Sequence, residues 1–447
     1  MSLKILHLST RLILGGSQEN TILSCEGQAR RGHEVHLAFG PIFGPEGSLL
    51  DRVRRFRTID GRKIEAYELP NLVREVNPMK DRRAAAELRD LLDEIRPDII
   101  HTHSSKAGII GRGVAWRVNQ AGFGSASRPN QKLEPSRRIG IVHTIHGPPF
   151  MPVQGSALQQ AKTWLINRGY VAAEKYAAKR CHVIVSVADA MTQLYLSKGI
   201  GRRGQYTTVY SGMETDKFLT AEPGEDRDSM RRSLGFADSD IVVGTVARLA
   251  EHKGHDDILD ALGADMLARR NLKLLWIGDG WWRGRLVERA LREGFSVAEL
   301  DKTGASSGSL TPIAKGSGAQ VVLTGLVPSE RVPAHIRAMD MLVHPSYREG
   351  LPRTVPQSLL CGVVPVSYDT DGTREACVEG TTGRLVPVGN RGALRAAVLE
   401  LADSPDDRAR LASAGRELCR KRFAAETMVA ELERVYESAL QLARAGA

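Results

Sequence analysis

Residues 241–277 read IVVGTVARLAEHKGHDDILDALGADMLARRNLKLLWI. Two short apolar runs, Ile241–Val246 and Leu272–Ile277, enclose a stretch near 254–269 that is amphipathic and long enough for a helix. A strand, a helix and a second strand in this order form a β–α–β unit, whose strands lie parallel in one sheet. The same alternation continues in both directions along the chain, so we expect an α/β protein built on parallel sheets.

The alternation divides the chain into two halves of similar size. A polar segment, Thr215–Asp228, lies between them and predicts a connection between an N-terminal domain, 1–214, and a C-terminal domain, 215–423. Strands are predicted at Lys4–Leu8, Glu34–Phe39, Asp98–Thr102, Gly140–Ile145, Val183–Val187, Tyr206–Val209, Ile241–Val246, Leu272–Ile277, Val321–Thr324, Met341–Val343, Val364–Ser367 and Gly383–Val386. Helices are predicted near 17–31, 80–95, 106–118, 156–180, 188–198, 254–269, 282–293, 329–338, 354–361, 390–402 and 424–443. Gly-, Ser- and Pro-rich stretches predict surface loops at Gln120–Arg138 and Asp301–Gln320.

Composition excludes several protein classes. Of the 447 residues, 42% are hydrophobic and 26% charged, which is typical of globular proteins. No apolar run approaches the roughly 18–20 residues of a membrane span, and the N-terminus is too short and too polar for a secretory signal. The five cysteines are scattered, which argues against disulfides and a Cys-rich zinc site. We therefore expect a cytoplasmic protein.

Glycines and polar residues follow the predicted strands in both halves. Ligands of open parallel sheets bind beyond the carboxyl ends of the strands, so these residues are candidate site residues. Gly15 and Gly16 follow the first strand and precede a helix, where the backbone can approach an anion. The other candidates of this kind are His103, Lys106, His143, His146, Gly278 and Gly280.

Arg248 and Lys253 are the most informative pair. Arg248 follows a strand and Lys253 opens the next helix, where the helix dipole adds partial positive charge. Two cations at a helix N-terminus suit a diphosphate, and each charge-assisted hydrogen bond contributes about 1.5–3 kcal/mol. The alternative is that both are solvated loop residues.

The ordered motifs resemble those of retaining glycosyltransferases with the GT-B fold, specifically glycosyltransferase family 4. They are the N-terminal GG loop, DIIHTHSSKAG, IVHTIHG, VVGTVARLAEHKG, LLWIGDG, VVLTGLVPSERVPAHIRAMDMLVHPSYREGLP and GTREACVEGTTGRLVPVGN. The resemblance implies two Rossmann-like domains facing across a cleft, with the C-terminal helix near 424–443 packed back on the N-terminal domain. It also implies transfer of a sugar from a nucleotide-diphosphate donor with retention of configuration.

The resemblance assigns roles to individual residues. Arg248 and Lys253 match the diphosphate-binding pair, and Gly15 and Gly16 match the loop beneath the diphosphate. Glu349 matches the acidic residue that contacts donor-sugar hydroxyls, with Gly350 and Leu351 beside the donor and Gly278 and Gly280 on the same side. His146 matches the histidine near the reacting sugar. Because the N-terminal domain would bind the acceptor, His103 and Lys106 are expected on the acceptor side.

One position departs from the family pattern. The family usually has a second Glu eight residues after the first, which binds the ribose hydroxyls, and this chain has Gln357 there. The amide oxygen can still accept a hydrogen bond, but the charge is lost. The resemblance thus predicts weaker nucleotide binding, by about 1–2 kcal/mol, or an altered nucleotide preference.

Other patterns point to less favoured readings. Asp369-Thr370-Asp371 matches a metal-binding Asp-x-Asp pattern but falls where the family has an ordinary loop. A zinc site is the second reading, but its candidate ligands do not share one strand face; they are His101, His103, His143 and His146. We therefore expect no metal and no other cofactor. A GT-B epimerase stays open as an alternative enzyme.

The net charge of +10 favours anionic partners, which leaves open a non-catalytic binder of anionic surfaces. Aromatic residues make up only 5%, and no basic strip interleaved with aromatics is present, so we expect no nucleic-acid partner. A lipid-linked acceptor in cell-envelope polysaccharide or glycolipid synthesis is one option. It would bring the basic residues Arg52, Arg54, Arg55, Arg57, Arg62 and Lys63 to the inner face of the membrane.

Overall fold

The computed structural model describes residues 2–43, 47–124, 133–150, 157–300 and 318–446. The chain divides into two compact units: unit 1 comprises Met1–Met213 and Ala425–Ala447, and unit 2 comprises Glu214–Ala424. Each unit contains one seven-stranded sheet whose strand pairs are all parallel. The predicted α/β class with two Rossmann-like domains is therefore confirmed.

Unit 1 has the strand order β3-β2-β1-β4-β5-β6-β7. Its strands are β1 (Lys4–Ser9), β2 (Glu34–Phe39), β3 (Ile64–Glu68), β4 (Ile99–His103), β5 (Gly140–Ile145), β6 (Val183–Ser186) and β7 (Tyr206–Thr208). Its helices are α1 (Gly16–Arg30), α2 (Leu50–Arg55), α3 (Pro78–Ile95), α4 (Ser105–Ala121), α5 (Ala157–Ala178), α6 (Asp189–Ser197) and α15 (Ala425–Ala445).

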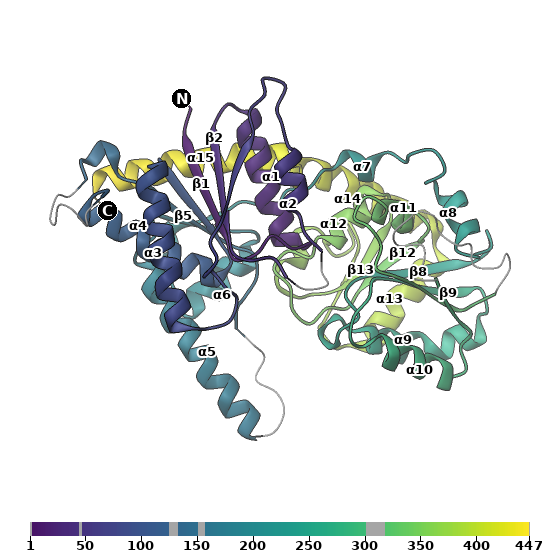
Figure 1. Cartoon of the computed structure of the whole chain (residues 1–447). Coiled ribbons are helices and arrows are strands. Elements are labelled where there is room, and N and C mark those ends of the chain that lie inside the picture. Colours follow the sequence, from purple (N-terminus) through teal and green to yellow (C-terminus); the bar gives the residue numbers. More distant parts are fainter. Residues whose placement is uncertain (1, 44–46, 125–132, 151–156, 301–317, 447) are drawn as a thin grey trace. The chain divides into compact units, whose positions relative to one another are not determined.

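Helices cover both faces of the unit 1 sheet. Leu6 and Ile100 pack in the core beneath α3 and α4, whereas Ile5 and Ile99 point to the opposite face and pack against α15. Figure 1 shows α15, the yellow helix, running along the sheet beside α1. Because side chains alternate along a strand, every second residue of β1, β4 and β5 points toward α1 and α15.

Unit 2 has the strand order β10-β11-β9-β8-β12-β13-β14. Its strands are β8 (Ile241–Val246), β9 (Leu272–Ile277), β10 (Val297–Glu299), β11 (Val321–Gly325), β12 (Met341–His344), β13 (Val364–Tyr368) and β14 (Arg384–Val386). Its helices are α7 (Asp216–Leu219), α8 (Arg227–Ser233), α9 (His255–Ala268), α10 (Arg283–Arg292), α11 (Val332–Arg337), α12 (Thr354–Leu360), α13 (Arg391–Asp403) and α14 (Pro405–Arg422).

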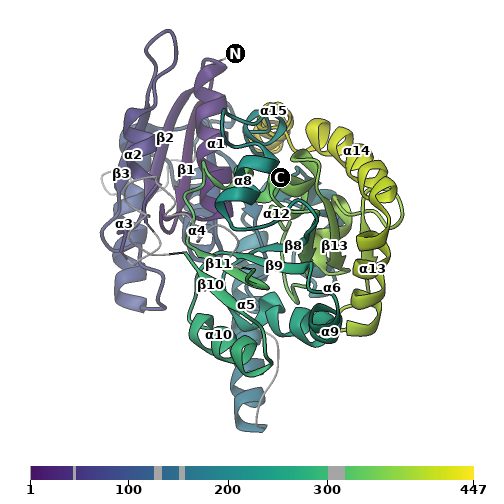
Figure 2. The same ribbon diagram turned by 90° about the vertical axis from the view of Figure 1, so that its right-hand side faces the viewer.

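The unit 2 sheet is also covered on both faces. Figures 1 and 2 show α9, α10 and α13 on one face and α11, α12 and α14 on the other. The first face carries the larger described core, which contains the fully buried Trp276 together with Leu262 of α9 and Leu286 of α10. Burial on both faces explains why β8, β9 and β12 are nearly continuous apolar runs.

The sequence predictions for the long, strongly apolar strands agree with the structure. β2, β5, β8 and β9 have the predicted bounds, and most other predicted strands differ by one residue. The prediction missed the short strands β3 and β10 and the helices α2, α7, α8 and α14. The segment Thr215–Asp228, predicted as a connection, contains α7 and the start of α8. Of the two predicted loops, residues 125–132 and 301–317 lie outside the described residues.

Among the described residues, no helix is both long and apolar enough to cross a membrane.

Candidate functional site

The strand order of unit 2 reverses direction between β8 and β12. In open parallel sheets, ligands bind outside the carboxyl ends of the two strands at such a reversal. The loop after β8 carries Arg248 and Lys253, and the loop after β12 carries Glu349. These three predicted site residues therefore lie in loops that begin at the carboxyl ends of two neighbouring strands.

Glycines allow the loops of unit 2 to approach one another closely. Gly254 follows Lys253 with φ +71°, and a Cβ atom there would lie 2.2 Å from the carbonyl oxygen of Pro345, just after β12. Gly278 has φ +135°, and a Cβ there would lie 2.1 Å from the Ala247 carbonyl oxygen. Real Cβ atoms do not come this close to a backbone oxygen, so both positions require glycine.

Lys253 and Glu349 form a direct ion pair. The Lys253 Nζ lies 2.5 Å from Glu349 Oε1, and both side chains are largely shielded from solvent, at 18% and 13% exposure. His344, the last residue of β12, places its Nε2 3.1 Å from the same oxygen. Within the described part of the chain, Glu349 Oε2 has no hydrogen-bond partner, so this oxygen can accept a hydrogen bond from a ligand.

The surroundings of Glu349 keep it ionised. Burial by itself would raise the pKa of Glu349, but the charge of Lys253 and the hydrogen bond with His344 outweigh burial and hold the pKa well below the ordinary value. The Glu349 backbone N–H donates to Asp371 Oδ2 at 2.6 Å. Burial raises the pKa of Asp371, which lies in the left-handed region at φ +44°. Asp371 thus anchors the backbone of the Glu349 loop.

The low pKa of Glu349 predicts a pH-dependent contribution to stability. A carboxyl group with a lower pKa in the folded state stabilises the protein above its unfolded pKa, about 4.3 for Glu, and this contribution is lost as the pH falls. The difference in unfolding free energy between the wild type and Glu349→Gln is therefore expected to shrink as the pH is lowered from about 5 to 3. Denaturant unfolding of both proteins across this range measures it. A difference that grows on acidification would contradict the ion pair.

Arg248 lies at the surface of the same loop region. Its guanidinium carbon lies 5.6 Å from the ring centroid of Trp281, which is 70% exposed. In the described residues, Arg248 has no carboxylate partner, unlike Lys253. The guanidinium is therefore available to an anionic ligand.

The remaining predicted donor-side residues lie in the loop after β9, in the Glu349 loop and on α12. Gly280 leads from β9 toward α10, and a Cβ there would lie 2.3 Å from the Leu249 carbonyl oxygen. The carbonyl of Gly350 accepts a hydrogen bond from the Gly372 N–H at 3.0 Å, and Leu351 is buried at 7% exposure. Gln357 lies half-buried on α12, which begins five residues after Glu349.

In unit 1, the strand order reverses between β1 and β4. Gly15 and Gly16 are exposed at the N-terminus of α1, and no side chain caps this helix end. The loop after β4 is tied to the loop after β1, since the hydroxyls of Thr10 and Ser104 lie 2.6 Å apart. Lys106 is already paired, with its Nζ 2.6 Å from Asp81 Oδ1. The predicted acceptor-side cation is thus an ion-pair partner in the free protein.

The two predicted histidines of unit 1 contact each other. His146 follows β5 directly and is half-buried, and its Nε2 lies 3.0 Å from Nδ1 of His103. His103 is 1% exposed, so it lies behind His146 and is shielded from solvent. His143 points to the other face of the sheet, where its Nδ1 lies 2.9 Å from the Thr102 hydroxyl.

Sequence reasoning missed two residues of the Glu349 environment, His344 and Asp371. The one sequence signal for His344 is that a polar residue ends an apolar strand. Asp371 stands out in the sequence only as part of the Asp-x-Asp pattern, but the two carboxylates of that pattern have separate partners: Asp369 pairs with Arg374, and Asp371 bonds the Glu349 N–H. No sequence signal indicates this backbone contact.

Comparison with known proteins identifies the family. The family described as "Glycosyltransferase Family 4" matches residues 14–217, and "Glycosyl transferases group 1" matches residues 240–404. The D-inositol 3-phosphate glycosyltransferase of Geodermatophilus obscurus is 26% identical over 357 residues, covering 77% of this chain and 67% of the relative. The UDP-Gal:alpha-D-GlcNAc-diphosphoundecaprenol alpha-1,3-galactosyltransferase of Escherichia coli is 22% identical over 374 residues, covering 83% and 80%.

Solved structures share the fold. Anabaena HepE, in a structure described as a complex with UDP and glucose, superposes with a TM-score of 0.71 at 18% identity, covering 98% of this chain and all of that one. The two matched family regions together span most of the chain. The first region corresponds mainly to unit 1 and the second lies within unit 2. The chain belongs to the glycosyltransferases of the GT-B fold, of the family 4 type.

Proposed function

We propose that this glycosyltransferase transfers a sugar from a nucleotide-diphosphate donor to an acceptor hydroxyl with retention of anomeric configuration. Unit 2 would hold the donor, and unit 1 would supply groups for the acceptor. The observation that carries the proposal is the Lys253–Glu349 ion pair at the carboxyl ends of β8 and β12. It combines a cation for the diphosphate with an ionised acceptor for sugar hydroxyls.

The two cations would act on the leaving group. Breaking the bond between the anomeric carbon and the phosphate oxygen leaves negative charge on the diphosphate, which the Arg248 guanidinium and Lys253 ammonium stabilise. Groups that are already in position pay no reorganisation cost at the moment of reaction. Glu349 Oε2 would accept a hydrogen bond from a sugar hydroxyl and orient the anomeric carbon.

Retention would follow if the acceptor oxygen attacks the anomeric carbon from the same face from which the diphosphate leaves. The Glu349 carboxylate is held by Lys253 and His344, which disfavours it as a nucleophile. We therefore assign the acceptor's proton to an oxygen of the departing diphosphate. The acceptor oxygen bonds to the anomeric carbon as the bond to the phosphate oxygen breaks, so no covalent enzyme intermediate forms.

The relatives suggest the substrate classes. The E. coli relative is named for a UDP-sugar donor and a diphosphoundecaprenol-linked acceptor. On this basis we propose a lipid-linked acceptor reached at the inner membrane surface. Of the basic residues near α2, Arg54 and Arg55 are exposed, whereas Arg52 is paired with Glu26 and Lys63 with Glu65. Co-sedimentation with vesicles should then increase with their anionic lipid content.

Ligand binding and product analysis test the proposal. A thermal-shift series with UDP, GDP and ADP identifies the nucleotide, because a ligand that binds the folded state raises the apparent stability. The matching nucleotide sugars are then supplied with lipid-linked and free-sugar acceptors in the presence of excess chelator. The expected product carries the same anomeric configuration as the donor by NMR. An inverted product, or sugar isomerisation without an acceptor, would refute the proposed reaction.

Gln357→Glu is expected to tighten binding of the nucleoside diphosphate. A carboxylate accepts stronger hydrogen bonds from ribose hydroxyls than an amide oxygen does, by about 1–1.5 kcal/mol, or roughly five- to tenfold in Kd. The donor KM should fall similarly while kcat changes little, as measured by calorimetry and steady-state kinetics. Gln441→Glu, an exposed position on α15, controls for the added charge. Equal affinity in all three proteins would place Gln357 away from the nucleotide.

A further inference from the structure

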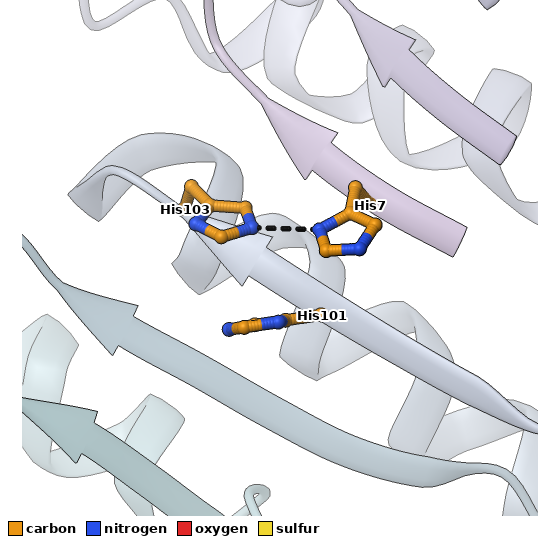
Figure 3. Close-up of side chains that lie close together, drawn as sticks. All are labelled: His7, His101 and His103. Atoms are coloured by element: carbon orange, nitrogen blue, oxygen red, sulfur yellow. Dashed lines mark hydrogen bonds between the residues drawn. The ribbon is translucent and has the colours of Figure 1, made fainter. Parts of the chain in front are cut away.

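Three buried histidines lie together in unit 1. His7 of β1 and His101 and His103 of β4 are each at most 1% exposed, and Nδ1 of His7 lies 2.9 Å from Nε2 of His103 (Figure 3). One nitrogen of each ring lies within 4.8 Å of the others, a spacing that a metal site could have. Hydrogen bonds to protein groups occupy both nitrogens of all three rings, so a metal ion would have to displace them. We therefore regard this cluster as part of the unit 1 core.

In unit 2, one buried carboxylate joins four segments at the carboxyl edge of the sheet. Asp257 is 3% exposed and is the third residue of α9, the helix that begins two residues after Lys253. Its Oδ2 accepts hydrogen bonds from the Tyr347 hydroxyl at 2.5 Å and from the Tyr368 hydroxyl at 2.7 Å. Its Oδ1 accepts a hydrogen bond from Nε of Arg391 at 2.9 Å. Three donors thus converge on a single side chain.

The three donors come from the segments at the carboxyl ends of β12, β13 and β14. Tyr347 lies three residues after β12 and two residues before Glu349. Tyr368 is the last residue of β13 and lies three residues before Asp371, whose carboxylate accepts from the Glu349 N–H. Arg391 is the first residue of α13, the helix that follows β14. The carboxylate therefore ties the Glu349 loop, the Asp371 segment and α13 to the start of α9.

The Glu349 loop is attached on both sides of Lys253. Before Lys253, the carbonyl oxygen of His252 accepts a hydrogen bond from the Tyr347 N–H at 2.9 Å and another from the Ser346 hydroxyl at 3.2 Å. After Lys253, Asp257 accepts the Tyr347 hydroxyl. The backbone and the side chain of Tyr347 therefore hold the same short stretch of chain, and Lys253 lies between the two attachment points.

Both tyrosine hydroxyls are protonated at neutral pH and donate to Asp257. Burial and the hydrogen bond to Asp257 raise the pKa of Tyr347 to about 12, and the same two causes raise the pKa of Tyr368. The Tyr347 and Tyr368 rings also meet edge to face, with centroids 5.6 Å apart. Tyr368 is 0% exposed, so no bulk water could replace Asp257 as the acceptor of its hydroxyl. Hydrogen bonds to an ionised acceptor are stronger than those between neutral groups, which makes Asp257 an effective anchor.

We propose that Asp257 is a positioning residue for sugar transfer: by accepting from Tyr347 and Tyr368 it holds the Glu349 loop against the segment that carries Lys253, and so fixes the distance between these two side chains. In a preorganised site, a displacement of about 1 Å can cost about a hundredfold in rate. The effect on transfer rests on the proposed function, whereas the effect on the Lys253–Glu349 contact does not.

A double-mutant cycle measures the Lys253–Glu349 contact without any substrate. Lys253→Ala, Glu349→Gln and the double variant of the full-length protein are unfolded by denaturant, and the departure from additivity gives the coupling between the two side chains. The cycle is then repeated in Asp257→Asn, which keeps the side-chain volume but offers three donors one acceptor oxygen instead of two. We expect the coupling to fall by about half or more in this background.

Asp265→Asn is the matched control for the cycle. Asp265 lies eight residues further along α9 and pairs with Arg395 of α13 at 2.6 Å, so its ion pair joins the same two helices as that of Asp257 with Arg391. It should leave the Lys253–Glu349 coupling at the wild-type value. A wild-type coupling in Asp257→Asn, or an equal loss in both variants, would overturn the proposal.

Tyr347→Phe is a second variant, at a position 43% exposed where folding is not at risk. It removes one of the hydrogen bonds to Asp257 and should lower kcat about threefold to tenfold. Tyr206→Phe is its control, since that hydroxyl donates to the Ile200 carbonyl oxygen of unit 1 at 2.7 Å. In the Asp257→Asn background, Tyr347→Phe should add less than about twofold, because both substitutions weaken the same hydrogen bond. Effects that simply multiply would refute the shared bond.

Kinetics separate this inference from the proposed function. Asp257→Asn should lower kcat roughly tenfold to a hundredfold relative to Asp265→Asn. A kcat equal to that of the control would refute the positioning role. Absence of sugar transfer by the wild type would instead refute the proposed function and leave the coupling measurement intact.

Discussion

Lys253→Ala is expected to lower kcat for sugar transfer by about two to three orders of magnitude. The ammonium group lies at the carboxyl end of the unit 2 sheet and contacts Glu349 in the free protein. Removing a preorganised charge that acts on the leaving group costs about 2.7–4 kcal/mol of transition-state stabilisation in comparable sites. The measurement is steady-state transfer with the donor nucleotide sugar identified by thermal shift.

Folding should survive this substitution. Glu349 keeps its contact with His344 and retains partial access to water, so we expect the loss in unfolding free energy to stay near 1–2 kcal/mol. Lys217→Ala is a matched control, since Lys217 forms an ion pair with Glu214 in the same unit, away from the strand ends. Turnover of Lys253→Ala close to that of Lys217→Ala would remove Lys253 from the mechanism.

The largest effect on stability is expected at the Arg112–Glu174 ion pair. The Arg112 guanidinium lies 2.7 Å from Glu174 Oε2, and both side chains are 1% exposed. Arg112 also donates to the carbonyl oxygen of Gly108 at 2.8 Å. The pair joins α4 to α5 beneath the interior strands β4 and β5, next to His143.

Glu174→Ala should lower the unfolding free energy of unit 1 by about 3–5 kcal/mol, because it leaves a buried arginine without a counter-charge. Replacing both partners by apolar residues, Arg112→Met with Glu174→Leu, should recover most of the loss, since no unpaired charge remains. Denaturant unfolding of the single and double variants measures both quantities. Glu65→Ala, which breaks an exposed pair with Lys63, should change stability by less than about 1 kcal/mol. A double variant no more stable than Glu174→Ala would contradict this account.

Helix α14 shows how the secondary-structure predictions failed. Its sequence, PDDRARLASAGRELCRKR, is mostly polar, and only Leu411, Ala412, Gly415 and Cys419 are buried, so the hydrophobic period is weak. A capping signal was nevertheless present. Ser404 accepts a hydrogen bond from the Asp407 N–H, Pro405 opens the helix, and acidic residues follow in the first turn. The strands β3 and β10 were missed because their sequences, IEAYE and VAE, mix apolar with acidic residues and only Ile64 is buried, so neither forms an apolar run.

The placement of the candidate site residues at one edge of a sheet was predictable, because parallel strands bring the residues that follow them to the same edge. Hydrophobic pattern alone suffices to predict that Arg248, Lys253 and Gly278 follow strands. It does not predict that Lys253 and Glu349 contact each other. They are 96 residues apart, and the contact depends on β8 and β12 being neighbours in the sheet.

The sequence by itself determined the α/β class, the β–α–β repetition and the loops that carry the candidate residues, because these follow from local hydrophobic period and from the geometry of parallel strands. The tertiary structure alone decided which side chains share protons and charges. The Glu349 loop is anchored by Asp371, and the buried rings of His7 and His101 contact an amide of α1 and a hydroxyl of α15. Hydrogen bonds extend only about 3 Å, so they depend on how distant segments pack, and no periodicity in the sequence encodes that packing.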